Sequence, residues 1–159
     1  MSLASIKAKL EEQNLFHSEF EWKEHPTVAG YDKKFKWSWM ATQLNTFFVA
    51  TDFGSTPIDV VDIESHLYAA FPFAEKNYSG WPRGLQSGLG VISILLSDTI
   101  SEEAKAYCRG LKSGKKWAGF TIPVVIDSKT GEVFSFSSNP MWGAIYFPYF
   151  RRKIQELTQ

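Results

Sequence analysis

A chain of 159 residues has the size of one ordinary domain, so we expect a single globular domain over residues 1–159. Apolar residues make up 44% of the chain and charged residues 21%, which excludes an intrinsically disordered protein. The 17 basic and 17 acidic side chains cancel, so no overall field draws the protein to an anionic membrane or to nucleic acid. This balance disfavours nucleic acid as a partner without excluding it, because a local basic patch could still bind.

Aromatic residues reach 16% of the chain, which is more large rings than a core of this size can hide completely. We therefore expect some rings to line a pocket or a homodimer interface. Cys108 is the only cysteine, which excludes an intrachain disulfide and favours a reducing, cytoplasmic location. Polar residues and glycines interrupt every apolar run before it reaches the roughly 18 residues of a membrane span, so we expect no membrane partner.

The first half of the chain predicts one helix followed by a β-meander. Leu3, Ile6 and Leu10 recur at helical spacing and indicate an amphipathic helix over residues 2–14. Rings and polar residues then alternate in the manner of strands. The predicted strands are 17–24, 33–41 and 44–52, with joints at 26–32 and 42–45, where residues that tolerate turn geometry collect.

The second half of the chain alternates helices and strands. A helix opens at Thr56-Pro57 and continues until Pro72 kinks or ends it. Thr99 and Glu102 have the spacing of a capping box and indicate the start of the next helix. The other predicted elements are a buried strand at 90–98, a strand at 120–127 with Pro123 at an edge position or bulge, a hairpin turn at 127–131, a returning strand at 132–138 and a last helix at 147–157.

This succession of elements predicts an α+β or mixed α/β fold. We expect a mixed sheet of about five to six strands, containing the β-meander and one right-handed βαβ unit, with the helices packed on the sheet. The βαβ unit would place strands 90–98 and 120–127 parallel to each other. Any ligand that binds where parallel strands end would then lie at their carboxyl edge.

The segment GWPRGLQSGLG, residues 80–90, is the first candidate binding site. Its glycines could let backbone N–H groups approach an anion, with Arg83 and Gln86 as the contacting side chains. Phosphate-binding glycine loops follow a strand and open a helix, whereas these glycines precede a strand. The sequence therefore favours a connection that needs glycine backbone freedom, with an anion site as the alternative.

Aspartates end three of the predicted strands. Asp98 and Asp127 end the two strands of the βαβ unit, and Asp52 ends the meander in the same way. Converging carboxylates of this kind could hold Mg²⁺ with several of its waters retained. Aspartate is also a common residue at turns and helix starts, and this plainer explanation fits all three positions better. We therefore expect no metal site. If the protein does bind a metal ion, these three aspartates are its candidate ligands.

Glu21 and Lys23 lie on the first predicted strand, on one face of it together with Glu19. This pattern and the α-β-β-β-α-β order resemble metal-dependent nucleases of the restriction-enzyme type. The resemblance implies that Glu21 holds a metal ion and that Lys23 acts near the scissile phosphate. The acid that such nucleases carry on the neighbouring strand has no match in this chain. An edge strand that shows alternating charge to solvent explains the same residues and is favoured.

The sequence indicates neither a zinc site nor a nucleophile. His17, His25 and His66 lack the spacing of metal ligands. Cys108 lies on the apolar stripe of its predicted helix, where a buried, inert thiol is the usual outcome.

The aromatic residues offer a last candidate surface. We expect Trp37 and Trp39 to share one strand face and Phe134 and Phe136 another, while residues 142–150 gather rings before the basic triplet 151–153. Rings interleaved with basic side chains occur both in grooves for single-stranded nucleic acid and in dimer interfaces. The zero net charge favours an interface or core role.

For each candidate site, a structural role explains the residues better than a catalytic one. We therefore expect a non-catalytic ligand-binding or protein-interaction domain. The alternative is a metal-dependent enzyme that processes phosphodiesters or phosphates. Its site would be the nuclease-like pair Glu21 and Lys23 or the aspartate cluster, with Mg²⁺ as its cofactor. Acids that converge in a concave pocket would indicate the enzyme, whereas an apolar cleft or an exposed aromatic face would indicate the binding domain.

Overall fold

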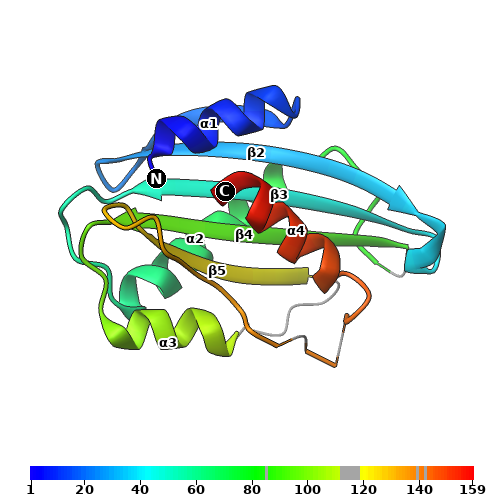
Figure 1. The fold of residues 1–159 in the computed structure, drawn as a ribbon. Helices are drawn as coiled ribbons and strands as arrows, with labels where there is room; N and C mark the ends of the chain where they lie inside the picture. Colours follow the sequence, from blue (N-terminus) through cyan, green and yellow to red (C-terminus); the bar gives the residue numbers. More distant parts are fainter. Residues whose placement is uncertain (85, 112–118, 139, 142) are drawn as a thin grey trace.

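Helices and strands alternate along the chain in the predicted order. The computed structural model describes residues 1–159 except 85, 112–118, 139 and 142. In these described residues the elements are α1 (Leu3–Glu12), β1 (Phe16–Trp22), β2 (His25–Lys36), the 3-10 turn η1 (Trp37–Trp39), β3 (Thr42–Asp52), α2 (Val60–Asn77), β4 (Ser87–Ser97), α3 (Glu102–Gly110), β5 (Gly119–Asp127), β6 (Val133–Phe134) and α4 (Phe147–Thr158) (Figure 1).

The strands form one mixed sheet in sequence order, from β1 to β6. The pairs β1–β2 and β2–β3 are antiparallel, which confirms the predicted meander. The pairs β3–β4 and β4–β5 are parallel, and β6 returns antiparallel to β5. The predicted α+β fold is therefore confirmed, with a parallel β3–α2–β4 crossover in addition to the predicted β4–α3–β5 crossover.

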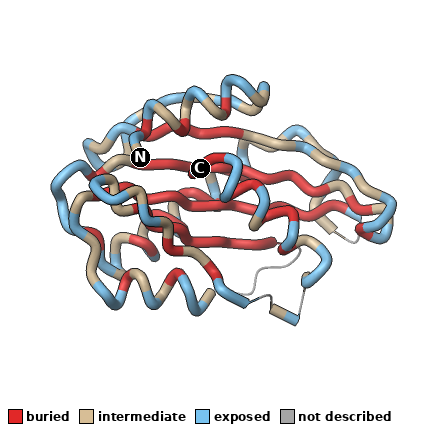
Figure 2. Tube along the Cα trace, viewed as in Figure 1, coloured by how far each residue is buried: buried red, intermediate tan, exposed pale blue. Residues whose placement is uncertain are grey.

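Helices cover the sheet on both faces. One apolar cluster joins α1 and α4 to side chains such as Phe48 and Ile94, and the clusters on the opposite face join α2 and α3 to side chains such as Phe47 and Leu95. Every residue of β4 is buried, as Figure 2 shows for the middle of the sheet. A parallel strand between two helical layers meets apolar side chains on both sides, so its sequence is apolar without alternation.

The start of the meander differs from the prediction. Residues 26–32, expected to be a joint, belong to β2, and the turn is the two-residue hairpin of Lys23 and Glu24. Both turn residues have positive φ, 48° and 65°, which is the backbone of a tight hairpin without its usual Asn-Gly signature. Gly30 lies inside β2. A glycine is needed there because a Cβ would collide with the side chain of Leu10 of α1.

The expected pairing of aromatic side chains on shared strand faces is wrong. Residues 37–39 form η1 instead of strand, so Trp37 is 81% exposed while Trp39 is buried in the core. Phe134 and Phe136 belong to different clusters, because the returning strand β6 ends at Phe134. In both places the strand ends before the second ring, so strand alternation no longer sets the face on which that ring lies.

Two helix boundaries also differ from the prediction. Helix α2 continues through Pro72 to Asn77, and its N-terminal cap is Asp59. Helix α3 is capped by Ser101, whose Oγ accepts from the backbone N–H of Ala104 at 3.1 Å, and Thr99 lies before the cap. In the part of the chain that the structure describes, no helix combines the length and apolar character that crossing a bilayer requires.

Pro123 lies where β5 lacks a described partner on its outer side. Among described residues β6 pairs only with Val125 and Ile126, so the proline leaves no ladder hydrogen bond unmade there. The edge position predicted for Pro123 is thus observed on that side of the strand, while its other side pairs with Ser93 of β4.

The glycine segment leads the chain from α2 into β4. Gly80 packs against the side chains of Gln43 and Asn45, which leave no room for a Cβ. The backbone N–H of Trp81 donates to Oε1 of Gln43 at 2.8 Å. Gly90 faces the ring of Phe150 with the same lack of space. Gly80 and Gly90 therefore allow close packing, whereas Gly84 has open space around its Cα.

We predict that Gly80→Ala lowers the free energy of unfolding by about 1–3 kcal/mol, because the added methyl group overlaps the buried amide of Asn45. Gly84→Ala is the matched control, since a Cβ at Gly84 has no described atom within 4 Å. Its effect should stay within about 0.5 kcal/mol. Urea unfolding of both variants measures this, and equal effects would contradict a packing role for Gly80.

Candidate functional site

The three candidate aspartates lie at one edge of the sheet. Strands β3, β4 and β5 are parallel, with Asp52 beside Leu96 and Asp127 beside Ser97. Asp52 and Asp127 therefore end their strands at the same, carboxyl edge as Asp98, which follows β4 directly. The predicted placement of these residues is confirmed, which leaves the question of what their carboxylates bind.

Each of these carboxylates interacts with neighbouring parts of the chain. Asp52 accepts from the N–H of Gly54 at 2.8 Å, and Asp98 forms an ion pair with Lys129 at 3.3 Å. Asp127 accepts from two turn N–H groups, and these hydrogen bonds, that of Thr130 first, lower the pKa of its carboxyl. Among the described residues, no three His, Cys, Asp or Glu side chains form a group that could hold a metal ion.

Glu21 and Lys23 lie at the outer hairpin of the sheet. Glu21 is an exposed residue of β1, which pairs with β2 and lies at the end of the strand order. Lys23 lies in the turn after the strand, and its Nζ lies 4.7 Å from the ring centre of Trp22. Because β1 ends at Trp22, Lys23 does not share a strand face with Glu21, contrary to the prediction.

Arg83 and Gln86 lie in the crossing from α2 to β4. The Arg83 guanidinium forms an ion pair with Glu75 at 2.6 Å and lies 5.5 Å from the ring centre of Phe71. Gln86 is exposed, and its backbone carbonyl accepts from the N–H of Gln43 at 2.9 Å. The guanidinium of Arg83 therefore already has an acidic partner in Glu75.

A series of buried hydrogen bonds, which the sequence did not predict, links α2 to the sheet. Nδ1 of His66 lies 2.6 Å from Oγ of Ser93, and Nε2 lies 2.8 Å from Oγ1 of Thr51. Thr51 continues to Thr27 at 2.8 Å, and Thr27 donates to the carbonyl of His25. A neutral imidazole with its proton on Nε2 satisfies every member of this series.

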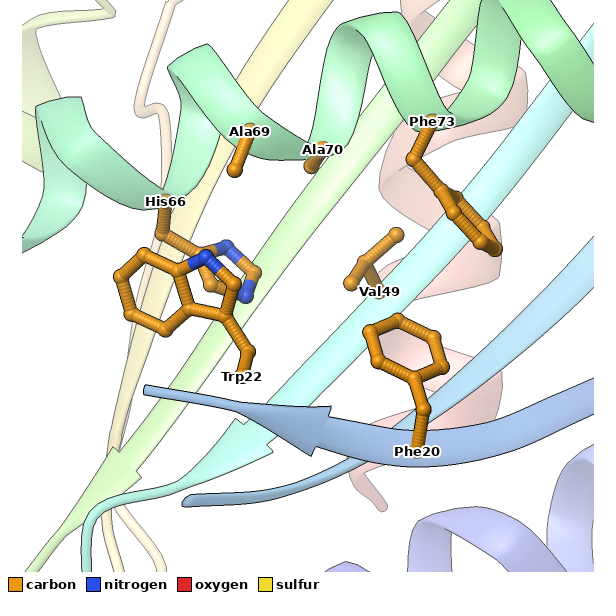
Figure 3. A pocket seen from close by; sticks show the side chains of 7 residues that line it. All are labelled: Phe20, Trp22, Val49, His66, Ala69, Ala70 and Phe73. Atoms are coloured by element: carbon orange, nitrogen blue, oxygen red, sulfur yellow. The ribbon is translucent and has the colours of Figure 1, made fainter. Parts of the chain in front are cut away.

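Burial keeps His66 neutral. The side chain is 1% exposed, and desolvation lowers its pKa to about 3. Figure 3 shows Trp22 beside the imidazole, and the two rings meet edge to face with centroids 4.9 Å apart. The adjoining cavity, of about 30 Å³, has room for about one water molecule and is lined mainly by apolar side chains. His66 thus has the environment of a core residue, without space for a substrate.

Cys108 is buried as predicted, and burial raises the pKa of its thiol to about 12. A thiol of this kind stays protonated near neutral pH and is a poor nucleophile.

Exposed rings gather at the opposite end of the strands from the aspartates. We call Phe35, Trp37 and Trp81 the aromatic surface; they are 39%, 81% and 49% exposed. Phe35 contacts both tryptophans edge-on, with centroids 5.2 Å from Trp37 and 5.9 Å from Trp81. By contrast, Phe147, Tyr149 and Phe150 of the predicted aromatic stretch 142–150 are core residues, and Trp142 lies outside the described residues.

The aromatic surface exists because the sheet is longer than the helices that cover it. The end of β2 and the turn η1 extend past the helices in the view of Figure 1. Phe35 lies next to the last residue of β2, and its partner Gln43 on β3 fixes the Trp81 backbone. Side chains from β2, η1 and the segment before β4 therefore meet where the described helices leave them uncovered.

Lysines alternate with Phe35 along β2, and Lys33 is the one that shares its strand face. Lys34 lies on the opposite face, where it lines a pocket together with Glu12, Asp32 and Glu156. None of Lys33, Lys34 and Lys36 forms an ion pair with a described residue. Lys33 donates to the carbonyl of Ser79 at 3.4 Å, and Lys36 lies 4.9 Å from the ring centre of Trp39. The aromatic surface therefore combines exposed rings with one lysine, Lys33, that has no ion-pair partner among the described residues.

Comparison of the chain with protein-family models, with curated proteins and with solved structures finds no match.

We predict that His66 makes the protein less stable in acid. Its pKa is about 6.5 in the unfolded chain and about 3 in the folded one, so between these values only the unfolded chain binds the proton. The free energy of unfolding should therefore fall with falling pH, with a contribution approaching about 1.4 kcal/mol per pH unit. Urea unfolding between neutral pH and about pH 4 measures this slope. His66→Gln should remove that contribution, and parallel curves for the two proteins would contradict it.

We also predict that Mg²⁺ leaves the melting temperature unchanged, because the aspartates at the strand ends already bind turn N–H groups and Lys129. A bound ion would raise stability by mass action. A Mg²⁺ titration followed by calorimetry tests this, with Ca²⁺ as a second ion. A rise in melting temperature that Asp98→Asn abolishes would establish a metal site at this edge.

Proposed function

We propose that this protein is a non-catalytic interaction domain that binds another protein through the aromatic surface. The observation that carries the proposal is the contact of three exposed rings at one uncovered end of the sheet. Exposed Trp and Phe side chains that touch one another form the kind of apolar anchor on which binding energy concentrates.

Lys33 indicates the charge of the partner. Since Lys33 shares the strand face of Phe35 and has no ion-pair partner among the described residues, a segment that carries a carboxylate beside an apolar side chain would complement the surface. In a symmetric homodimer centred on this surface, Lys33 of one copy would lie near Lys33 of the other. This repulsion favours a different, acidic chain over a second copy.

The surface suits a protein better than single-stranded nucleic acid. Phe35 packs edge-on against Trp37 and Trp81, at 85° and 65°, so the three rings form a compact anchor rather than parallel platforms for successive bases. The chain as a whole also carries no net charge to attract a polyanion.

The burial of the reactive side chains His66 and Cys108 supports the non-catalytic part of the proposal. The imidazole of His66 has both nitrogens within hydrogen-bond distance of hydroxyls, and the thiol of Cys108 is desolvated. Arg83 and Asp98 are neutralised by partners from the chain itself. A single, buried cysteine also fits the reducing, cytoplasmic location that we include in the proposal.

A peptide of about twelve residues that alternates phenylalanine with glutamate tests this function. We expect it to bind and to change tryptophan fluorescence, whereas the same peptide with lysine in place of glutamate does not bind. Trp37→Ala should weaken binding by about tenfold or more. Tyr68→Ala is the matched control, because Tyr68 is an equally exposed ring, 82%, on α2.

Three results would contradict the proposal. The first is equal binding of the peptide by wild type and Trp37→Ala. The second is a wild-type dimer in sedimentation that Trp37→Ala converts to a monomer, which would assign the surface to self-association. The third is a preference for oligothymidylate over the acidic peptide, which would assign it to single-stranded nucleic acid.

A further inference from the structure

A second surface, of opposite charge, lies between α2 and α3. The two helices cover the same face of the sheet and enclose a groove of about 520 Å³. We call it the α2/α3 groove; its lining residues are Val60, Glu64, Glu103, Ala106, Tyr107 and Gly110. It shares no residue with the aromatic surface, so its role is independent of the function proposed above.

The groove is lined by small and apolar residues that would suit a helix. Ala106 and Gly110 lie one turn apart on α3, and both are exposed, so another backbone can approach closely there. On α2, Val61 and Tyr68 are 66% and 82% exposed and lie on the same side of the helix as Glu64. The apolar area of the groove therefore continues onto the outer side of α2.

The charged side chains that line the groove are both acidic. Glu64 comes from α2 and Glu103 from α3, and neither forms an ion pair with a described residue. Glu64 accepts a hydrogen bond from the hydroxyl of Tyr107 at 3.3 Å, which holds its carboxylate at the groove. The nearby cation Lys105 is engaged by Glu102 at 2.7 Å. The groove thus presents two carboxylates that have no ion-pair partner among the described residues, beside apolar side chains.

We propose that the α2/α3 groove docks a cationic amphipathic helix of another protein. Its apolar side chains would lie over Ala106, Gly110 and Val60, and its lysines or arginines would pair with Glu64 and Glu103. A helix that binds in a groove usually inserts apolar side chains at helical spacing and pairs its charged side chains with opposite charges at the rim. The protein would then join an acidic partner at the aromatic surface to a basic partner at this groove.

The probe for the test is an amphipathic helical peptide of leucine and lysine, about fourteen residues long, with a leucine-glutamate peptide of the same pattern as its counterpart. We expect the lysine peptide to shift amide resonances of α2 and α3 in the intact ¹⁵N-labelled protein, and the glutamate peptide to leave them unchanged. The double variant Glu64→Lys with Glu103→Lys should weaken binding by about tenfold or more.

Two further variants separate the groove from general charge attraction. Glu11→Lys with Glu132→Lys changes the net charge equally at exposed positions on other elements, and should leave the affinity within about twofold. Ala106→Trp fills the groove without changing charge and should weaken binding as strongly as the double variant. The amide spectrum of each variant verifies that it is folded.

The outcomes that would overturn this proposal differ from those that bear on the aromatic surface. Absence of binding, equal weakening by the two charge-reversed variants, or unchanged affinity of Ala106→Trp would each exclude the groove as the docking site. Shifts that map to residues 33–37 would place the peptide on the aromatic surface instead, against the lysines there, and would also overturn it.

Discussion

The structure depends on one constraint: its parallel strands need cover on both faces. Strands β3, β4 and β5 pair in parallel, and β4 is buried along its whole length. The two parallel crossovers place α2 and α3 on one face, and the chain ends supply α1 and α4 for the other. The sheet could not stay apolar on both sides without all of these helices, since each covers a part of it that would otherwise meet water.

The same constraint explains what is buried and what is left open. Where α2 crosses the sheet, polar side chains of the interior satisfy one another, as in the chain from Ser93 through His66 to Thr51. Beyond the ends of the helices, the ladder of β2 and β3 continues to the pair Lys36–Thr42. Rings in that extension have no described helix above them, which leaves the aromatic surface exposed. The proposed functions thus lie on the uncovered end of the sheet and on the outer side of its helical layer.

Much of the fold could be predicted from the sequence because its signals are local. The apolar run of β4 and the stripe of α1 need no tertiary information. The edge shared by Asp52, Asp98 and Asp127 also follows from parallel pairing. The tight hairpin at Lys23 and Glu24 could not be predicted, because these residues adopt positive φ only where the paired strands require it. Gly30 resembled a turn residue, whereas its role is the close approach of Leu10.

The candidate site was harder to predict than the fold. Trp37 and Trp39 have the spacing of one strand face, and only the 3-10 turn separates an exposed ring from a core ring. His66 has no neighbour in sequence that marks it, because its partners Thr51 and Ser93 reach it through the assembled sheet. Lys33, Glu64 and Glu103 have no ion-pair partner among the described residues, and nothing in their local sequence distinguishes them from paired residues such as Glu75 and Glu102.

Hydroxyl-radical footprinting of the tryptophans tests the central claim, that the sheet end around Trp37 is uncovered, most directly. If this end of the sheet is uncovered, Trp37 should be oxidised at a rate close to that of a free indole and Trp39 far more slowly. Neither rate should depend on protein concentration. Equal rates for the two residues, or protection of Trp37 even in dilute solution, would contradict it.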